Sequence, residues 1–250
     1  MSGHSHWARI KRAKASNDAK RGRVWSKLAR RIIVAARTGG GNPEENLNLR
    51  YAIDDAKGAN MPNDTIDRAI KRGTGELGGE NYEQVAYEGY GPGGVAFLVY
   101  CLTDNRSRTA PDMRKIFERS GGQLGASNCV AWMFEQKGTF VVSSDRADEE
   151  TLVEIALESG ADDVKTEGDL FQITCQPSSF SDVKKALAER DIETVSAEIA
   201  MMPKNMVKVT GEKARQVVSL MEALEDNDDV QNVYANFDVP DEVMAEVGKQ

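Results

Sequence analysis

The sequence predicts an α+β fold with three domains: an N-terminal helical bundle followed by two α/β units. Three observations support this prediction. The first 76 residues carry apolar side chains at helical spacing, residues after about 80 alternate as strands do, and a Gly-rich stretch, residues 74–79, lies between the two patterns. The length of 250 residues also allows more than one hydrophobic core.

The helical domain, residues 1–76, is expected to contain three helices. The first should present one apolar stripe, and Gly39 to Gly41 should end it. The expected helices are 19–38, 43–58 with Asn42 as its N-cap and Pro43 at its first position, and 63–73. Residues 4–15 lack apolar periodicity and are expected to form a mobile basic arm.

The acidic remainder is expected to form two α/β domains. Residues 136–203 follow the order β-α-β-β-α-β, the ferredoxin-like arrangement. Residues 204–240 are too short to bury a sheet face alone, so we expect them to complete residues 80–135 and the ferredoxin-like domain to be inserted between them. The expected strands are 85–90, 95–103, 129–135, 138–143, 163–166, 170–176, 193–200, 206–209 and 230–236, and the expected helices are 110–119, 149–158, 180–189 and 212–225.

Charge is distributed unevenly along the chain. The first forty residues hold eleven Lys and Arg residues against one acid, Asp18, a formal charge of +10. Since the whole chain carries −8, the other 210 residues carry −18. This asymmetry indicates a polyanion as partner, with the acidic domains held away from phosphate or contacting a protein partner. The alternative is a basic helix that docks on the protein's own acidic surface.

The cations of the basic segment are the candidate nucleic-acid-binding residues. The apolar stripe of the first helix would dock on a core, while the opposite side would lay cations along a phosphate backbone. Acidic residues at i±4 are nearly absent, which argues against an ordinary solvated surface. The candidate residues are Arg9, Lys11, Arg12, Lys14, Lys20, Arg21, Arg23, Lys27, Arg30, Arg31 and Arg37.

Catalytic motifs have no support in the sequence. Gly89, Gly91 and Gly94 match the dinucleotide-binding pattern G-x-G-x-x-G, but that pattern requires a helix directly afterwards. A strand is expected here instead, so a hairpin turn is the better interpretation. The only histidines, His4 and His6, lie in the basic arm, where a Ser-His or Cys-His pair would have to form on a tail. We therefore expect a protein that is not an enzyme and has no cofactor.

Cysteine spacing and hydropathy indicate the compartment. Cys101, Cys129 and Cys175 are far apart and include no C-x-x-C pair, which fits thiols in a reducing cytosol and argues against a zinc site. The longest apolar run, residues 95–102, is eight residues long, whereas a bilayer span needs roughly twenty. The sequence therefore predicts a cytoplasmic protein with neither a metal site nor a membrane span.

Five motifs resemble those of the YebC family. They are GHSHWARIK at 3–11, DAKRG at 18–22, ANMPNDTIDRAIKRGTG at 59–75, YEGYGPGGV at 87–95 and LTDNRSRT at 102–109. The second half is also similar in length and element order. The resemblance implies a helical N-terminal domain plus two α/β domains. It further implies a bacterial transcriptional regulator that binds DNA or, as in related members, a translational activator on the ribosome. The first motif begins at residue 3, which leaves no room for a presequence and favours a bacterial cytosol.

The expected function is regulation through nucleic-acid binding, as a transcriptional regulator that binds DNA through its basic N-terminal domain. The first alternative is a translational activator that contacts ribosomal RNA. Neither charge nor resemblance separates these two, because both backbones are polyanions. A third alternative is a scaffold whose basic arm contacts an acidic protein. No helix offers an evident set of Arg, Asn or Gln for base edges, so no target sequence is predicted.

Overall fold

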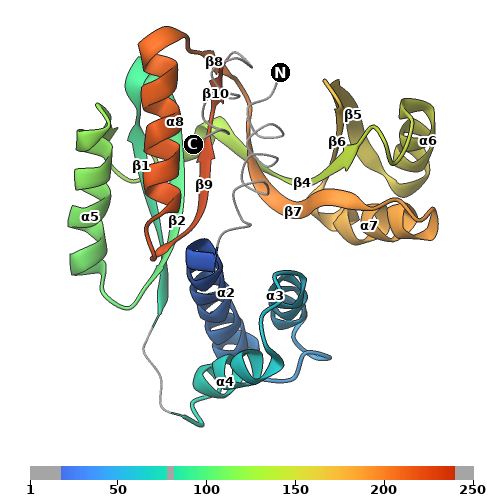
Figure 1. Cartoon of the computed structure of the whole chain (residues 1–250), viewed down its shortest axis with the longest axis horizontal. Coiled ribbons are helices and arrows are strands. Elements are labelled where there is room, and N and C mark those ends of the chain that lie inside the picture. The colour runs from blue at the N-terminus through green and yellow to red at the C-terminus, as the bar shows by residue number, and fades with distance from the viewer. Residues whose placement is uncertain (1–17, 78–81, 240–250) are drawn as a thin grey trace.

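The computed structural model describes residues 18–77 and 82–239 and arranges them in a helical part and two α/β parts (Figure 1). The helical part consists of α2 (Asp18–Gly39), α3 (Leu47–Gly58) and α4 (Asn63–Gly73). The expected bounds of the third helix are confirmed, and those of the first differ by one residue at each end. The predicted basic arm lies outside the described residues.

An apolar core holds the three helices together. Leu28, Ile32, Ile33 and Ala36 lie on one side of α2, as their spacing predicts, and are buried against apolar residues of α3 and α4. Gly73 allows α4 to cross α2 closely, because a Cβ atom at this position would lie 2.6 Å from the carbonyl oxygen of Ile33. The apolar stripe of α2 therefore packs in the core of the helical part, as the sequence predicts.

The second helix begins later than predicted. Asn46, rather than Asn42, is its N-cap: the Oδ1 atom accepts a hydrogen bond from the backbone N–H of Leu49 at 3.1 Å. The Nδ2 atom of Asn46 donates to the carbonyl oxygens of Ala35 and Gly40, at 2.8 Å each. The predicted first turn is non-helical. Contacts with α2 decide where α3 begins, and capping preferences read along the sequence do not reveal them.

The first α/β part contains a four-stranded antiparallel sheet in the order β3-β1-β2-β9. Its elements are β1 (Glu83–Tyr90), β2 (Ala96–Thr103), α5 (Arg106–Arg119), β3 (Gln123–Leu124), α8 (Gly211–Glu225) and β9 (Val230–Ala235). Two short strands, β8 (Val207–Lys208) and β10 (Phe237–Asp238), form a separate parallel pair. The pairing of β2 with β9 joins the C-terminal elements to the first sheet, as the sequence predicts.

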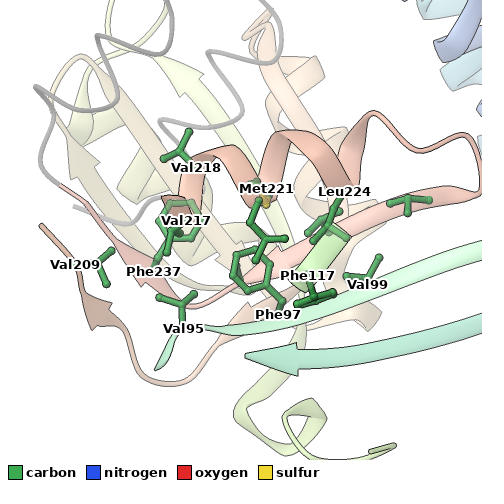
Figure 2. Close-up of a cluster of buried hydrophobic side chains, with 14 of the residues drawn as sticks. Val95, Phe97, Val99, Phe117, Val209, Val217, Val218, Met221, Leu224 and Phe237 are labelled. Carbon is green, nitrogen blue, oxygen red and sulfur yellow. The ribbon is translucent and has the colours of Figure 1, made fainter. Parts of the chain in front are cut away.

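The main core of this part lies between the sheet and the helices α5 and α8 (Figure 2). Phe97 of β2 meets Phe117 of α5 edge to face, with ring centroids 5.9 Å apart. Val217, Met221 and Leu224 of α8 close the same cluster. Helix α5 begins four residues before its predicted start, because Asn105 caps it by accepting from the backbone N–H of Arg108 at 3.1 Å.

The second α/β part contains the antiparallel sheet β5-β6-β4-β7. Its elements are β4 (Phe134–Ser143), α6 (Glu149–Ser159), β5 (Ala161–Glu167), β6 (Leu170–Cys175), α7 (Phe180–Glu189) and β7 (Thr194–Pro203). Phe140 and Phe180 stack with centroids 4.8 Å apart at its centre. The observed β-α-β-β-α-β sequence of elements is the predicted one.

The predicted strands 129–135 and 138–143 are wrong as separate strands. A single strand, β4, runs from Phe134 to Ser143, and a loop with a 3-10 turn precedes it. The buried carboxylate of Glu88 explains the loop, because it accepts hydrogen bonds from the backbone N–H groups of Asn128, Val130 and Ala131 at 2.6 to 2.8 Å. These N–H groups are therefore not available to a strand ladder.

Strands β4 and β7 form a stem that connects the two α/β parts. They pair from Phe134 opposite Pro203 to Val142 opposite Thr194. Near the first sheet, Phe134 and Ala200 are buried in a cluster with residues of β2 and β9. The predicted insertion, residues 136–203, therefore includes Ala200, which packs on the first sheet. A boundary between the two α/β parts that keeps Ala200 with the first sheet crosses the β4–β7 ladder at Gly138 and Ile199.

Replacing residues 139–198 by a short turn is expected to leave a protein that unfolds cooperatively, because Gly138 and Ile199 face each other across the ladder. The measurement is thermal unfolding followed by circular dichroism. The wider replacement of 137–203, which removes Ala200, should melt at a lower temperature. Aggregation of the narrower variant under conditions where the intact chain stays folded would contradict the prediction.

Candidate nucleic-acid interface

The structure describes the side chains of four of the eleven candidate cations, all on α2. These are Lys27, Arg30, Arg31 and Arg37. Arg9, Lys11, Arg12 and Lys14 lie outside the described residues. Lys20, Arg21 and Arg23 belong to α2, but their side chains are not among those described.

Lys27 and Arg30 contact an acidic segment of the same chain. This acidic segment, residues 222–229, holds five Asp and Glu residues and no Lys or Arg. Lys27 donates a hydrogen bond to the carbonyl oxygen of Glu225 at the C-terminal end of α8, where the helix dipole is negative. Arg30 donates to the carbonyl oxygen of Asp228, and its guanidinium lies 3.3 Å from the carboxylate of Asp229. For these two cations, docking on the protein's own acidic surface is confirmed.

Arg31 and Arg37 have more exposed positions. The guanidinium of Arg31 lies 2.9 Å from the carboxylate of Asp55 on α3, and both side chains are roughly half exposed. An exposed pair of this kind contributes about 0–1 kcal/mol, so a phosphate group can replace the carboxylate at little cost. Arg37 is exposed in the last turn of α2. These two side chains thus remain accessible to a polyanion.

Three further exposed cations lie on α4 and were not among the candidates. Arg68, Lys71 and Arg72 are exposed on α4. Because Gly73 packs against α2 at Ala36, the C-terminal turns of α2 and α4 lie side by side, and Lys71 and Arg72 share that end of the bundle with Arg37. The sequence contains these cations within the motif at 59–75, but cations near a helix end also complement its dipole, so the pattern alone did not single them out.

Asp229 is the centre of a polar network that joins the helical part to the first sheet. Its side chain is 7% exposed. Arg108 of α5 donates to both of its carboxylate oxygens, at 2.9 and 3.2 Å, and the hydroxyl of Thr109 donates at 2.8 Å. Arg30 of α2 lies on the same carboxylate. The motif at 102–109 therefore supplies two hydrogen-bond donors, Arg108 and Thr109, to the carboxylate that also forms an ion pair with α2.

This network determines the ionisation of Asp229. Burial alone would raise the pKa of its carboxyl group. The hydrogen bonds from Arg108 and Thr109, together with the positive charges of Arg108 and Arg30, outweigh burial and hold that pKa below its ordinary value. Asp229 is therefore charged at neutral pH, and its interactions are those of a carboxylate.

The glycine motif has a structural role. The chain turns after Tyr90 through a short 3-10 turn, Pro92–Gly94, and returns as β2, antiparallel to β1. The expected hairpin turn is confirmed, because the element that directly follows the glycines is the strand β2 and not a helix. A Cβ atom on Gly91 would lie 2.6 Å from the ring of Phe97, so the side chain is absent because the core approaches closely. The motif packs the hairpin against α8.

The cysteines are buried or partly buried thiols. Burial raises the pKa of Cys101 to about 12, and it also raises the pKa of Cys129 and Cys175, so all three remain protonated at neutral pH. Within residues 18–77 and 82–239, no three His, Cys, Asp or Glu side chains gather as a metal site would require. None of the helices in this part of the chain has the length and apolar character of a membrane span.

The chain matches two family models along most of its length. Residues 5–76 match the TACO1/YebC protein N-terminal domain, and residues 82–237 match the TACO1/YebC second and third domain. A probable transcriptional regulatory protein from Desulfatibacillum aliphaticivorans is 53% identical over 246 residues, covering 98% of this chain and 100% of the relative. Another of that name, from Pelotomaculum thermopropionicum, is 54% identical over 243 residues, covering 96% and 100%.

A solved structure gives the same result for the fold. The crystal structure of a conserved hypothetical protein from Aquifex aeolicus superposes with a TM-score of 0.81 and 48% sequence identity, covering 89% of this chain and 92% of the other. The family resemblance indicated by the five motifs of the first half is thereby confirmed, and the family match extends through the second half. The chain belongs to the TACO1/YebC family.

Proposed function

We propose that this protein is a transcriptional regulator that binds DNA through the basic surface of its helical part. The observation that carries the proposal is the exposed set of cations at the shared end of α2 and α4, on a chain whose remainder is strongly acidic. The names of the relatives, probable transcriptional regulatory proteins, support the same class of function. The mode is contact with phosphates, and no catalytic step belongs to it.

The acidic α/β parts complete this proposal. In it, residues 1–76 are the nucleic-acid-binding domain, residues 80–135 with 204–240 form one acidic domain, and the ferredoxin-like residues 136–203 form the other. The pairing of β2 with β9 supports the two-segment domain. Like charge repels phosphate from these surfaces, which orients the bound polyanion toward the helical part and leaves the acidic surfaces for contacts with a protein partner. Ribosomal RNA is the alternative target.

The test neutralises the exposed cations. In the variant Arg37→Gln, Lys71→Gln, Arg72→Gln, we expect weaker binding to duplex DNA of every sequence. The slope of log K against log salt should flatten by about 0.9 for each lost phosphate contact. Titrations monitored by fluorescence anisotropy at several salt concentrations measure both effects.

The matched control removes the same charge from the second α/β part, with Arg146→Gln, Lys165→Gln and Lys185→Gln, and should leave the slope unchanged. Equal effects of the two triple variants would show that only net charge matters and would contradict the assigned surface. Sedimentation of lysate through a gradient then separates the two targets. Co-migration of the wild type with ribosomes, lost in the Arg37, Lys71, Arg72 variant, would favour ribosomal RNA over DNA.

A further inference from the structure

A rigid, uncharged surface with one exposed tryptophan lies on the first α/β part. Residues 120–134 contain no Asp, Glu, Lys or Arg, in a chain where these types make up 29% of residues. Trp132 within this loop is 64% exposed, and Tyr90 beside it is 37% exposed. Neither ring belongs to a buried core cluster. The two rings thus face solvent on a surface that lacks the acidity of its surroundings.

The two rings are held in place by hydrogen bonds. The indole N–H of Trp132 and the hydroxyl of Tyr90 both donate to the carbonyl oxygen of Cys129, at 3.1 and 3.2 Å. The Nζ atom of Lys204 donates to the backbone carbonyl oxygen of Trp132 at 2.9 Å, which places a cation beside this residue. Because the rings are already fixed, a ligand that stacks on them loses little side-chain entropy on binding.

The backbone of the loop is fixed by a buried charge. The Glu88 carboxylate holds the N–H groups of Asn128, Val130 and Ala131. Asn128 adopts a φ of +65°, in the left-handed region that residues other than glycine rarely adopt. The buried carboxylate and the left-handed turn at Asn128 together hold the loop in one conformation, so its surface keeps one shape for a ligand.

We propose that Trp132, flanked by Tyr90 and Lys204, is a stacking platform for an unpaired base of a nucleic acid. One indole ring is enough to stack one base, and Lys204 is positioned for an adjacent phosphate. The loop residues before Cys129 are Gly, Ala, Ser and Asn. They offer little apolar area, whereas a stable protein interface buries roughly 800 Å² on each partner. This favours a base over a protein partner.

Charge favours the same ligand. The acidic domains repel a polyanion over most of their surface, but the loop has no charge, and the negative charge of Glu88 is buried beneath it and neutralised by three N–H donors. Tyr90 ends β1, whereas Lys27 and Arg30 contact the chain just before β9, near the opposite end of the eight-residue strands. Asp229 bonds to Leu102, opposite Gln84 and six residues from Tyr90, so the platform is roughly 20 Å of strand length away from the acidic segment and the two can be tested separately.

The inference rests on the proposed function, since it adds unpaired nucleotides to what the protein binds. The test titrates the full chain with short oligoadenylate, oligodeoxyadenylate and a duplex of the same length. Trp132→Ala should weaken binding to both single strands roughly tenfold and change duplex binding by less than about twofold. Trp132→Phe, which keeps a ring, should retain most of the affinity. The fluorescence of Trp132, obtained by subtracting the signal of Trp132→Phe from that of wild type, should be quenched when single strands bind, because stacking on a base quenches indole emission.

The outcomes separate the two hypotheses. If wild type binds neither strands nor duplex, the proposed function fails. If wild type binds single strands but Trp132→Ala binds them equally well, with unchanged thermal unfolding, the platform alone is overturned. The platform is also overturned if Trp132→Ala loses a protein captured from lysate while its affinity for single strands stays unchanged. A preference of the wild type for the RNA strand would assign the source of the base to RNA, through contacts with its 2′-hydroxyls.

Discussion

Replacing Asp229 with Ala is expected to destabilise the protein by about 3 kcal/mol, because it removes the acceptor of two charge-assisted hydrogen bonds and one hydroxyl bond at a buried position. The substitution also releases Arg30, so the helical part loses a contact with the first sheet. Urea unfolding at neutral pH measures the change. Asp228→Asn is the control, because Asp228 has an exposed side chain and contributes only its carbonyl oxygen.

The dependence on pH gives an independent check of the same residue. The pKa of Asp229 is lower in the folded state, so its stabilising contribution is complete above the unfolded value of about 3.9 and is lost as the pH falls through the folded value. The stability difference between wild type and Asp229→Asn should therefore be largest at neutral pH and narrow in acid. A difference that stays constant down to the acid limit of folding would contradict the role assigned to the carboxylate.

Neutralising the acidic segment is expected to tighten nucleic-acid binding. In Glu225→Gln, Asp226→Asn, Asp228→Asn, the segment loses three charges next to Lys27 and Arg30, so phosphate competes for these cations more favourably. Each such exposed interaction contributes about 0.2–1 kcal/mol, which suggests a gain of roughly tenfold in affinity at low salt. The carbonyl contacts of the two cations remain in this variant. Asp229 is left unchanged to preserve the fold.

A control variant distinguishes a local effect from a change in net charge. Glu149→Gln, Glu150→Gln and Glu193→Gln remove the same charge from exposed positions of the second α/β part. Anisotropy titrations of both variants with the same duplex, at matched salt, should show the gain only for the acidic segment. An equal gain in affinity in both variants would mean that the acidic segment does not compete with phosphate for Lys27 and Arg30.

The helices and most strands could be predicted because their causes are local. The apolar positions of α2 recur every three or four residues, and α4 begins directly after Pro62 and ends at Gly73, so nearby residues in the sequence show both helices. The loop before β4 could not be predicted in this way. Its alternating residues resemble a strand, but the carboxylate that takes up its N–H groups belongs to Glu88, about forty residues earlier in the chain.

The partners of the basic helix were hidden for the same reason. A search for acids at i±4 finds none near Lys27 and Arg30, yet the groups that they bind lie 198 residues later. Charge composition predicts that cations and acids are separated along the chain, but only the fold shows that α8 brings the acidic segment back to α2. The sequence therefore predicts the basic region as a whole, but it does not show which of its cations contact acidic groups of the same chain and which are exposed.

The stem formed by β4 and β7 determines how the second α/β part can move. A flexible linker would let this part tumble freely, whereas two hydrogen-bonded strands of ten residues each resist bending within the sheet plane and yield mainly by twisting. Tyr51 of α3 adds a hydrogen-bond contact of 3.2 Å to Ser181 of α7 at the far side. Twisting of the stem is therefore transmitted to the first sheet, because Phe134 and Ala200 pack beneath β2, and to the loop before β4, which carries Trp132.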